Sequence, residues 1–256
     1  MAPTALHLRA IPWSIEDLDL PLDNASPSTV TTLLARGVAR GDGTPVDASL
    51  LWALDVQTRT ECLLRIAALE GSSTFELRLR CHAPACGKPL EIELTLDELL
   101  TQRGDWDAPI VAEFGGVRRS LRAPTGEDQR SWSGRAFDDV REAGLAIATS
   151  LLDDSSTTSL SDADVTVIER LLAEHDPLVD FTVLAACPYC GAEEEYEVDL
   201  LEHAIKRLRD ARDRLLAEIQ MLAASFHWSE SEIVAIPAWR RSRYLALNER
   251  ATRGGG

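Results

Sequence analysis

Two cysteine pairs in matching surroundings constrain the fold of this chain more than any other feature. Cys81 and Cys86 form the first pair, and Cys187 and Cys190 form the second. A phenylalanine lies six residues before each pair and a glycine follows each pair directly, at Phe75, Phe181, Gly87 and Gly191. Polar and apolar residues alternate on both sides of each pair, which is typical of half-buried strands. The chain therefore contains a duplicated unit of strand, cysteine-bearing turn, strand and helix start.

The two turns together supply the ligands of one metal site. Zinc in structural sites takes four thiolates in a tetrahedron, each about 2.3 Å from the metal. A tight turn points two sulfurs at one metal, and its glycine permits a positive φ. Two such turns complete the ligand set and leave no position open for a substrate. We therefore predict that Cys81, Cys86, Cys187 and Cys190 bind one structural zinc ion that joins two zinc-knuckle-like β-hairpins.

Three other interpretations of the cysteines stay open. His82 could replace one cysteine in the ligand set. Cys187 and Cys190 could form a redox pair of the thioredoxin type, or the four thiols could be unligated. The fifth cysteine, Cys62, is expected on an apolar helix as a small buried residue.

The net charge of the chain restricts the classes of partner that it can bind. It carries 42 acidic and 26 basic residues, a formal net charge of −16. Such a field repels nucleic acid unless a local basic patch overcomes it, and it suits partners with basic surfaces. No apolar run is long enough for a membrane span, and Met1 to Arg9 lacks the pattern of a signal peptide. We therefore expect a cytoplasmic protein. In that reducing environment disulfides do not persist, so paired cysteines bind metal or do redox work.

The sequence contains none of the common catalytic patterns. Its five histidines stand in no HExxH arrangement, and neither a GxSxG motif nor a glycine-rich phosphate loop occurs. The acidic run Glu193–Glu195 is interpreted as a solvated strand end. We therefore predict a protein that is not an enzyme.

The polarity patterns predict an α+β protein that is mainly helical, since Ala and Leu are common and aromatic residues make up only 5%. Residues 1–29 are expected to form an extended N-terminal arm. Residues 30–109, with the first cysteine hairpin, are expected to pack as one domain with residues 110–198, which contain the second. The expected elements are a helix from Ser26-Pro27, a loop over 37–45, one helix over 47–70, strands over 75–80 and 90–96, a short helix from Asp97, a hairpin over 111–121, a helix from Thr125 to about Leu152, a loop over 153–162, a helix over 163–174 and the second hairpin over 181–198.

Residues 199–250 are predicted to form a C-terminal helical module that docks on a partner. Apolar residues recur at helical spacing up to Phe226, Ser229 and Glu232 form a capping box, and Pro237 precedes a last helix. Aromatic and arginine side chains dominate the energetics of many protein interfaces. A DNA-binding helix-turn-helix is the alternative interpretation, and residues 251–256 are expected to be disordered. The candidate partner-binding residues are Phe226, Trp228, Trp239, Arg240, Arg241 and Tyr244.

Three parts of the chain resemble baseplate-hub assembly proteins of contractile phage tails and contractile injection systems. The most specific part, residues 222–245, reads LAASFHWSESEIVAIPAWRRSRYL and is similar to that family's closing pattern. Residues 121–128, LRAPTGED, are similar to its strand that leads into a Pro-Thr-Gly helix start. The two cysteine turns resemble its paired zinc knuckles, although four residues rather than the family's usual two separate Cys81 from Cys86. The resemblance covers about residues 30–248.

The resemblance implies a non-enzymatic structural or assembly component of the baseplate hub, present in the cytoplasm or within a phage-like particle. Its expected partners are hub, spike or tube proteins of the contractile device, with no nucleic acid among them. Two rival functions stay open. One is a zinc-ribbon regulator that binds nucleic acid, and the other is a thiol oxidoreductase that uses Cys187 and Cys190.

Overall fold

The computed structural model describes residues 6–11, 13–106, 109–114, 116–152 and 160–254. Helices make up 50% and strands 19% of the described structure, which confirms the predicted α+β class with a mainly helical content. The named strands form four separate sheets, each of two antiparallel strands. Among the described residues, no helix has both the length and the apolar character that a membrane crossing requires.

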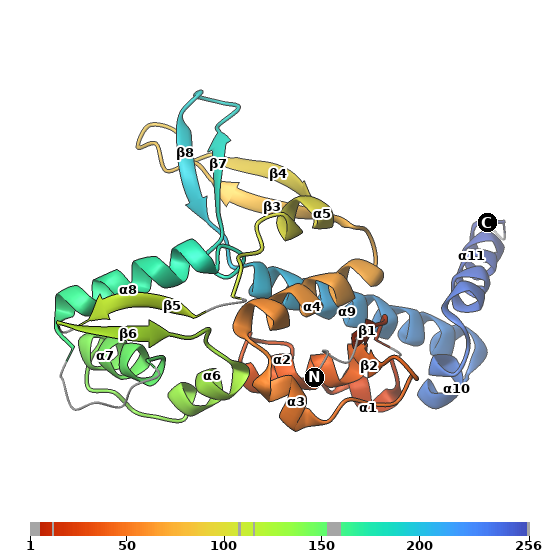
Figure 1. Ribbon diagram of the computed structural model, residues 1–256. Helices are drawn as coiled ribbons and strands as arrows, with labels where there is room; N and C mark the ends of the chain where they lie inside the picture. The colour runs from red at the N-terminus through yellow and green to blue at the C-terminus, as the bar shows by residue number, and fades with distance from the viewer. Residues whose placement is uncertain (1–5, 12, 107–108, 115, 153–159, 255–256) are drawn as a thin grey trace.

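The elements follow one another in the order shown in Figure 1. The helices are α1 (Ile15–Leu18), α2 (Pro27–Gly37), α3 (Ala48–Ala53), α4 (Val56–Leu69), α5 (Leu96–Leu100), α6 (Gly126–Ser133), α7 (Val140–Ser150), α8 (Asp162–His175), α9 (Leu200–Phe226), α10 (Glu230–Val234) and α11 (Ala238–Gly254). The strands are β1 (Leu6–Leu8), β2 (Val38–Arg40), β3 (Thr74–Arg80), β4 (Pro89–Thr95), β5 (Ile110–Phe114), β6 (Val117–Leu121), β7 (Thr182–Ala186) and β8 (Glu193–Glu197).

The helical body is built around α2, α4 and α9, whose apolar faces meet in the main core (Figure 1). Leu63 of α4 and Ile205 of α9 are both 0% exposed there. Arg59 is buried in the same body and donates hydrogen bonds to the carbonyls of Leu51 (2.7 Å) and Pro27 (2.9 Å). These bonds satisfy a cation that burial would otherwise penalise, and they join α4 to α3 and to the start of α2.

The N-terminal segment belongs to this body. Strand β1 pairs with β2, with Leu6 opposite Arg40, and Ile11 and Leu22 are buried in the main core. The predicted arm over residues 1–29 is therefore not an extended arm from residue 6 onward, and the predicted loop over 37–45 contains β2. Strands of three residues are stable only through distant pairing, which a local polarity pattern does not reveal. Residues 1–5 lie outside the described residues.

The single helix predicted over residues 47–70 is two helices, α3 and α4. Asp55 lies between them with an extended backbone, and its carboxylate accepts a hydrogen bond from the N–H of Thr58 at 2.7 Å. A side chain in this N-cap position satisfies an amide that the first turn leaves without a partner. The capping preference of Asp55 therefore divides an otherwise continuous apolar pattern.

The helix predicted from Thr125 to Leu152 is also divided, into α6 and α7. Thr125 and Asp128 form the predicted capping box at the start of α6, which ends at Ser133 with Gly134 as its C-cap. Asp139 then caps α7 by accepting a hydrogen bond from the N–H of Glu142 at 2.8 Å. Capping by Asp139 therefore favours the start of a new helix over continuation of the preceding one.

A second, smaller core lies between the β5–β6 hairpin and helices α7 and α8. Phe114, Leu121 and Ile168 are buried in it. The predicted hairpin over 111–121 and the predicted helix over 163–174 are confirmed as β5–β6 and α8. The predicted loop over 153–162 falls mostly on residues 153–159, which lie outside the described residues.

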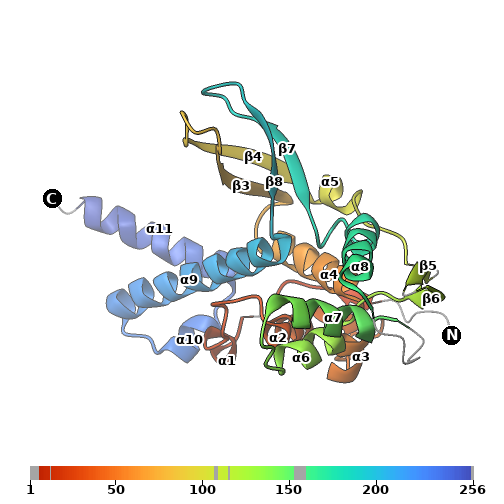
Figure 2. The same cartoon turned by 90° about the vertical axis from the view of Figure 1, so that its left-hand side faces the viewer.

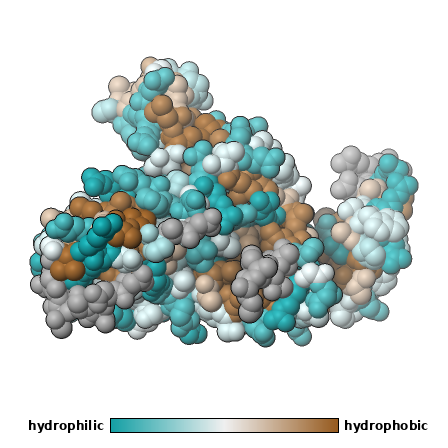
Figure 3. Space-filling view, in the orientation of Figure 1, coloured by the Kyte–Doolittle hydropathy of each residue, from teal (hydrophilic) through white to brown (hydrophobic). Residues whose placement is uncertain are grey.

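The two cysteine hairpins, β3–β4 and β7–β8, are present as predicted and project together from the helical body (Figures 1 and 2). Their turns lie at the end away from the body, and the turns stay close to each other in both views. Figure 3 shows hydrophilic residues over much of this projection. The hairpin tips therefore lie outside the main core.

Helix α9 leads from the second hairpin to the C-terminal module. It starts shortly after β8, and its first half is buried in the main core. Its second half packs against α10 in a separate apolar cluster that includes Leu215, Leu222 and Ile233. Helix α11 then projects from the body and runs to Gly254 (Figure 1). The predicted disordered tail over 251–256 is thus helical to Gly254, and residues 255–256 lie outside the described residues.

Candidate metal centre

The two cysteine turns stand on hairpins of the same register. Leu77 is opposite Ile92 in the first hairpin, and Val183 is opposite Tyr196 in the second. These residues occupy matching positions, since Leu77 and Val183 each lie four residues before the first cysteine of their pair, and Ile92 and Tyr196 each lie five residues after the glycine. The hairpins are therefore two copies of one structural unit.

The turns also close in the same way, although the first contains two more residues. The N–H of Cys81 donates to the carbonyl of Lys88 at 3.0 Å, and the N–H of Cys187 donates to the carbonyl of Ala192 at 2.8 Å. The glycine after each pair has a positive φ, with values of 59° at Gly87 and 74° at Gly191. A side chain at either glycine would strain the turn. The two extra residues of the first turn therefore lie between its cysteines and do not change how the turn closes.

The turns bring all four cysteine sulfurs into one cluster. The four Sγ atoms lie within 4.8 Å of one another. The Sγ atoms of Cys81 and Cys190 are 3.7 Å apart, and those of Cys86 and Cys187 are 3.8 Å apart. Metal–sulfur bonds of about 2.3 Å in a tetrahedron place the sulfurs about 3.8 Å from each other, whereas a disulfide needs about 2.05 Å. The cluster is therefore close enough to hold a metal ion, and it has the spacing of four ligands of one metal.

The closest sulfur contacts each join one hairpin to the other. Cys81 and Cys187, the first cysteine of each turn, are both 2% exposed, while Cys86 is half-buried and Cys190 is exposed. A metal bound here would lie near the surface of the projection but would be enclosed by protein sulfur. The arrangement links residues 81–86 to residues 187–190 directly.

Backbone N–H groups of both turns point at the sulfurs. The N–H of Ala83 acts to lower the pKa of Cys81, but burial and the neighbouring thiols raise it to about 12. The N–H of Tyr189, with that of Cys190, holds the pKa of Cys187 at about 7 despite burial. Hydrogen bonds to the charged form favour thiolates, whereas thiolates in one cluster repel each other. A cation at the centre of the cluster removes this repulsion, so the donors and the sulfurs together suit a bound metal.

Glu194 braces the cluster from the second hairpin, a role that the sequence interpretation missed. Its carboxylate accepts hydrogen bonds from the N–H of His82 (2.8 Å) and the hydroxyl of Tyr196 (3.0 Å). Glu193 and Glu195 are exposed as predicted, but the side chain of Glu194 is only 23% exposed. The signal was its position two residues before a tyrosine, which places both side chains on one face of the strand.

A small apolar group supports the same contact. Tyr196 is 3% exposed and packs with Leu90 and Ala185 around the buried cysteines. Burial and then the hydrogen bond to Glu194 raise the pKa of Tyr196 to about 12. At the surface, the ammonium of Lys88 lies 4.6 Å from the ring centroid of Tyr189. These contacts bridge the hairpins but cover little area compared with the main core.

His82 and Cys62 stand apart from the cluster. The side chain of His82 is 67% exposed, and its ring lies 5.0 Å from that of Tyr196. Cys62 is buried in the main core, as predicted, and burial raises its pKa to about 11. Within the described part of the chain, the four clustered cysteines are the one group of three or more metal-ligating side chains close enough to share an ion.

The six candidate partner-binding residues occupy two kinds of position in the C-terminal module. The rings of Phe226 and Trp228 stack 4.7 Å apart, and Tyr244 lies 5.3 Å from Trp228. Arg241 donates to the carboxylate of Glu218 at 2.8 Å. These four candidates therefore hold α9, the α9–α10 connection and α11 together.

Trp239 and Arg240 are the two candidates on the open surface of the module. The side chain of Trp239 is 72% exposed, and Arg240 is also exposed. Both follow Pro237 in the first turn of α11. An exposed tryptophan beside an arginine matches the composition of protein interface centres.

No protein-family model, curated protein or solved structure matches this chain.

Proposed function

We propose that the metal of the four-cysteine cluster is zinc and that its role is structural. Tetrahedral sets of four thiolates select zinc or iron among the common protein metals. All four positions are filled by protein sulfur, so a bound ion has no open position at which to activate water or substrate. The observation that carries this proposal is the 3.7 Å and 3.8 Å sulfur spacing across two hairpins.

The optical spectrum of the purified protein separates zinc from iron. We expect a colourless protein that develops near-ultraviolet and weaker visible absorption bands when cobalt replaces the metal, as tetrahedral cobalt–thiolate sites are coloured and zinc sites are not. A red or brown protein as isolated would show an iron site instead.

We further propose that the chain is a non-enzymatic structural or assembly component of the baseplate hub of a contractile injection system or phage tail. The support comes from residues 222–245, which resemble that family and form the end of α9, all of α10 and the start of α11. Residues 121–128 add the strand end of β6 and the capped start of α6. Hub, spike or tube proteins are the proposed partners.

In this proposal the metal positions the docking module. The second hairpin runs into α9, and α9 carries the module at its far end. Arg207 of α9 also donates to the carbonyl of Thr74 in the first hairpin at 2.8 Å. Both hairpins are thus attached to α9 and the metal fixes them to each other, which adds to the packing that already holds the first half of α9 in the main core.

The docking role is tested by the double substitution of Trp239→Ala with Arg240→Ala. Both side chains are exposed, so we expect the fold to be unchanged and co-purification with co-expressed hub, spike or tube proteins to fall at least tenfold. The matched control is Arg243→Ala, which removes an exposed arginine of the same helix. Unchanged co-purification would refute the docking role, and tight binding to duplex DNA at low salt would favour the nucleic-acid rival.

A further inference from the structure

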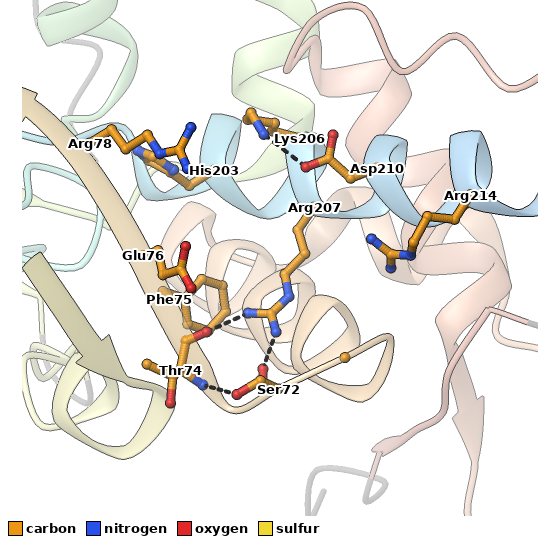
Figure 4. A pocket seen from close by; sticks show the side chains of 11 residues that line it. Ser72, Thr74, Phe75, Glu76, Arg78, His203, Lys206, Arg207, Asp210 and Arg214 are labelled. Atoms are coloured by element: carbon orange, nitrogen blue, oxygen red, sulfur yellow. Dashed lines mark hydrogen bonds and ion pairs between the residues drawn. The ribbon is translucent and has the colours of Figure 1, made fainter. Parts of the chain in front are cut away.

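A polar groove lies between strand β3 and helix α9, on the side of the first hairpin away from β4 (Figure 4). Its volume is about 760 Å³. Thr74, Glu76 and Arg78 line it from the strand, and one face of α9, including Lys206 and Arg214, lines it from the helix. The groove is separate from both the cysteine cluster and the C-terminal docking residues.

The strand side of this groove is an open sheet edge. The N–H of Leu96 donates to the carbonyl of Ser73 and that of Cys81 donates to the carbonyl of Lys88. In an antiparallel pair, the backbone N–H and C=O groups of successive residues point alternately toward the partner strand and away from it. Since these hydrogen bonds place Ser73 and Cys81 toward β4, the backbone groups of Thr74, Glu76 and Arg78 point away from it.

Beyond Thr74, that edge has no partner strand among the described residues. Within the described residues β3 pairs only with β4. The carbonyl of Thr74 accepts a hydrogen bond from Arg207 at 2.8 Å, whereas Glu76 and Arg78 have no strand opposite their outer backbone groups. An added strand would lie about 4.8 Å from β3, on the α9 side. Edges of this kind are templates for an extended segment of another chain.

The helix side of the groove is basic in a chain whose net charge is −16. Three of the lining residues on α9 are Lys or Arg and one is acidic. Lys206 pairs with Asp210 at 2.8 Å and Arg78 pairs with Glu91 at 3.1 Å. Among the described residues, Arg207 and Arg214 form no ion pair with a carboxylate.

Two cations without carboxylate partners therefore face one groove. The guanidinium of Arg207 lies over the ring of Phe75, 4.8 Å from its centroid, and donates to backbone carbonyls of the β3 entry. Burial and then the charge of Arg214 lower the pKa of Arg207, and the charge of Glu76 opposes this only in part. An acidic ligand would relieve this repulsion, and a basic or purely apolar one would not.

We propose that the groove binds an extended acidic segment of a partner protein, which adds as a strand to the free edge of β3. Backbone hydrogen bonds to Glu76 and Arg78 hold the segment, and its carboxylates meet Arg207, Arg214 and Lys206. The charged side chains of β3 discourage apolar strands from pairing at this edge. This inference does not rest on the baseplate assignment, because none of these residues belongs to the proposed docking face.

A fluorescein-labelled ten-residue peptide of alternating glutamate and valine provides the probe, with fluorescence anisotropy as the readout. We expect the full-length protein to bind it and to bind an alternating lysine–valine peptide at least tenfold more weakly. The double substitution of Lys206→Glu with Arg214→Glu is expected to weaken binding of the acidic peptide at least tenfold. Arg207 is left intact because it braces the start of β3.

The matched control is Arg141→Glu with Arg170→Glu, which changes the net charge equally at two exposed arginines of α7 and α8. We expect it to alter binding less than threefold. An equal loss in the control would show that net charge alone attracts the peptide, and would overturn the proposal. Unchanged circular dichroism and metal content establish that both variants are folded.

The strand-addition step has its own readout. The acidic peptide with alternate backbone N-methyl groups keeps its charges but cannot form one edge of hydrogen bonds, so we expect at least tenfold weaker binding. Hydrogen exchange at the amides of Glu76 and Arg78 should slow at least tenfold in the saturated complex. Equal binding of the methylated peptide, or displacement of the peptide by inorganic phosphate beyond the effect of sodium chloride at equal ionic strength, would overturn strand addition.

Discussion

The paired hairpins and the C-terminal module lie at opposite ends of α9 and are held together by different chemistry. The hairpin tips meet through four sulfurs, one buried tyrosine and a bridging carboxylate. The module is held by buried Leu215, Leu222 and Ile233, with three aromatic rings packed beside them. A small apolar cluster contributes little free energy of burial, so we expect the tips to depend on a bound metal, whereas the module depends on packing.

The largest effect should follow from removing one metal ligand. We expect Cys187→Ser to reduce bound metal from one per chain to near zero, because three sulfurs no longer close the tetrahedron. Amide exchange in residues 75–96 and 181–198 should then accelerate by more than a hundredfold, while the main core stays protected. Hydrogen exchange with mass spectrometry, together with metal analysis, measures both.

Cys62→Ala is the matched control for the ligand substitution. Cys62 lies in the main core, so its loss should lower the free energy of unfolding modestly and leave the metal in place. If Cys62→Ala also released the metal, or if Cys187→Ser kept it, the division between the two regions would be wrong.

The next largest effect is expected in the stability of the C-terminal module. Leu222 is 0% exposed at the centre of the module cluster. We expect Leu222→Ala to lower the free energy of unfolding by about 2–5 kcal/mol, since it removes buried methyl groups and leaves a cavity. Urea denaturation followed by circular dichroism measures this loss. Metal content should not change, and its loss would contradict the independence of the two regions.

The pH dependence of stability distinguishes the body from the metal site. Burial, and then the nearby carboxylate of Asp55, raise the pKa of Asp176 to about 7, and its Oδ1 has no hydrogen-bond partner. The folded protein therefore binds more protons than the unfolded chain between about pH 4 and pH 7, and its stability falls as the pH rises through that range. Asp176→Asn should remove this slope.

Because the pKa of Asp176 lies at about 7 in place of 3.8, we expect Asp176→Asn to raise the free energy of unfolding by up to about 4 kcal/mol at pH 8 and to change it little near pH 4. Urea midpoints measured across this range give the comparison. Metal content at pH 8 should be that of the unmodified chain. A variant with the same slope as the unmodified chain would show that Asp176 ionises normally.

The smallest effect on stability is expected at the open surface of α11. Trp239 is 72% exposed, so Trp239→Ala should change the free energy of unfolding by no more than about 0.5 kcal/mol. Thermal denaturation tests this directly. A loss above about 1.5 kcal/mol would place Trp239 among the residues that hold the module together, and would remove it from the proposed docking face.

The sequence predicted both hairpins and their shared cysteine cluster because those signals are local and repeated. Alternation with a period of two marked β3, β4, β7 and β8, and the aligned phenylalanines and glycines set their register. The meeting of the two hairpins followed from ligand count, since neither pair alone completes a tetrahedron.

Other features depended on competition between helix capping and helix continuation, or on contacts between residues far apart in the sequence. Asp55 and Asp139 divide two predicted helices, because a capped start outweighs a continuous apolar pattern. The β1–β2 pair joins three-residue strands that lie far apart in sequence, so no local period marks it. Glu194 was hidden within an acidic run, and only the hydrogen bond that its carboxylate accepts from the N–H of His82 shows that it bridges the hairpins.

X-ray absorption at the zinc edge, with metal analysis of the same sample, tests the central claim most directly. The account predicts about one zinc per chain, bound by four sulfur atoms at about 2.3 Å with no nitrogen or oxygen ligand. Zinc well below one per chain, with the four clustered cysteines free to react with a thiol reagent in the unfolded state, would contradict it.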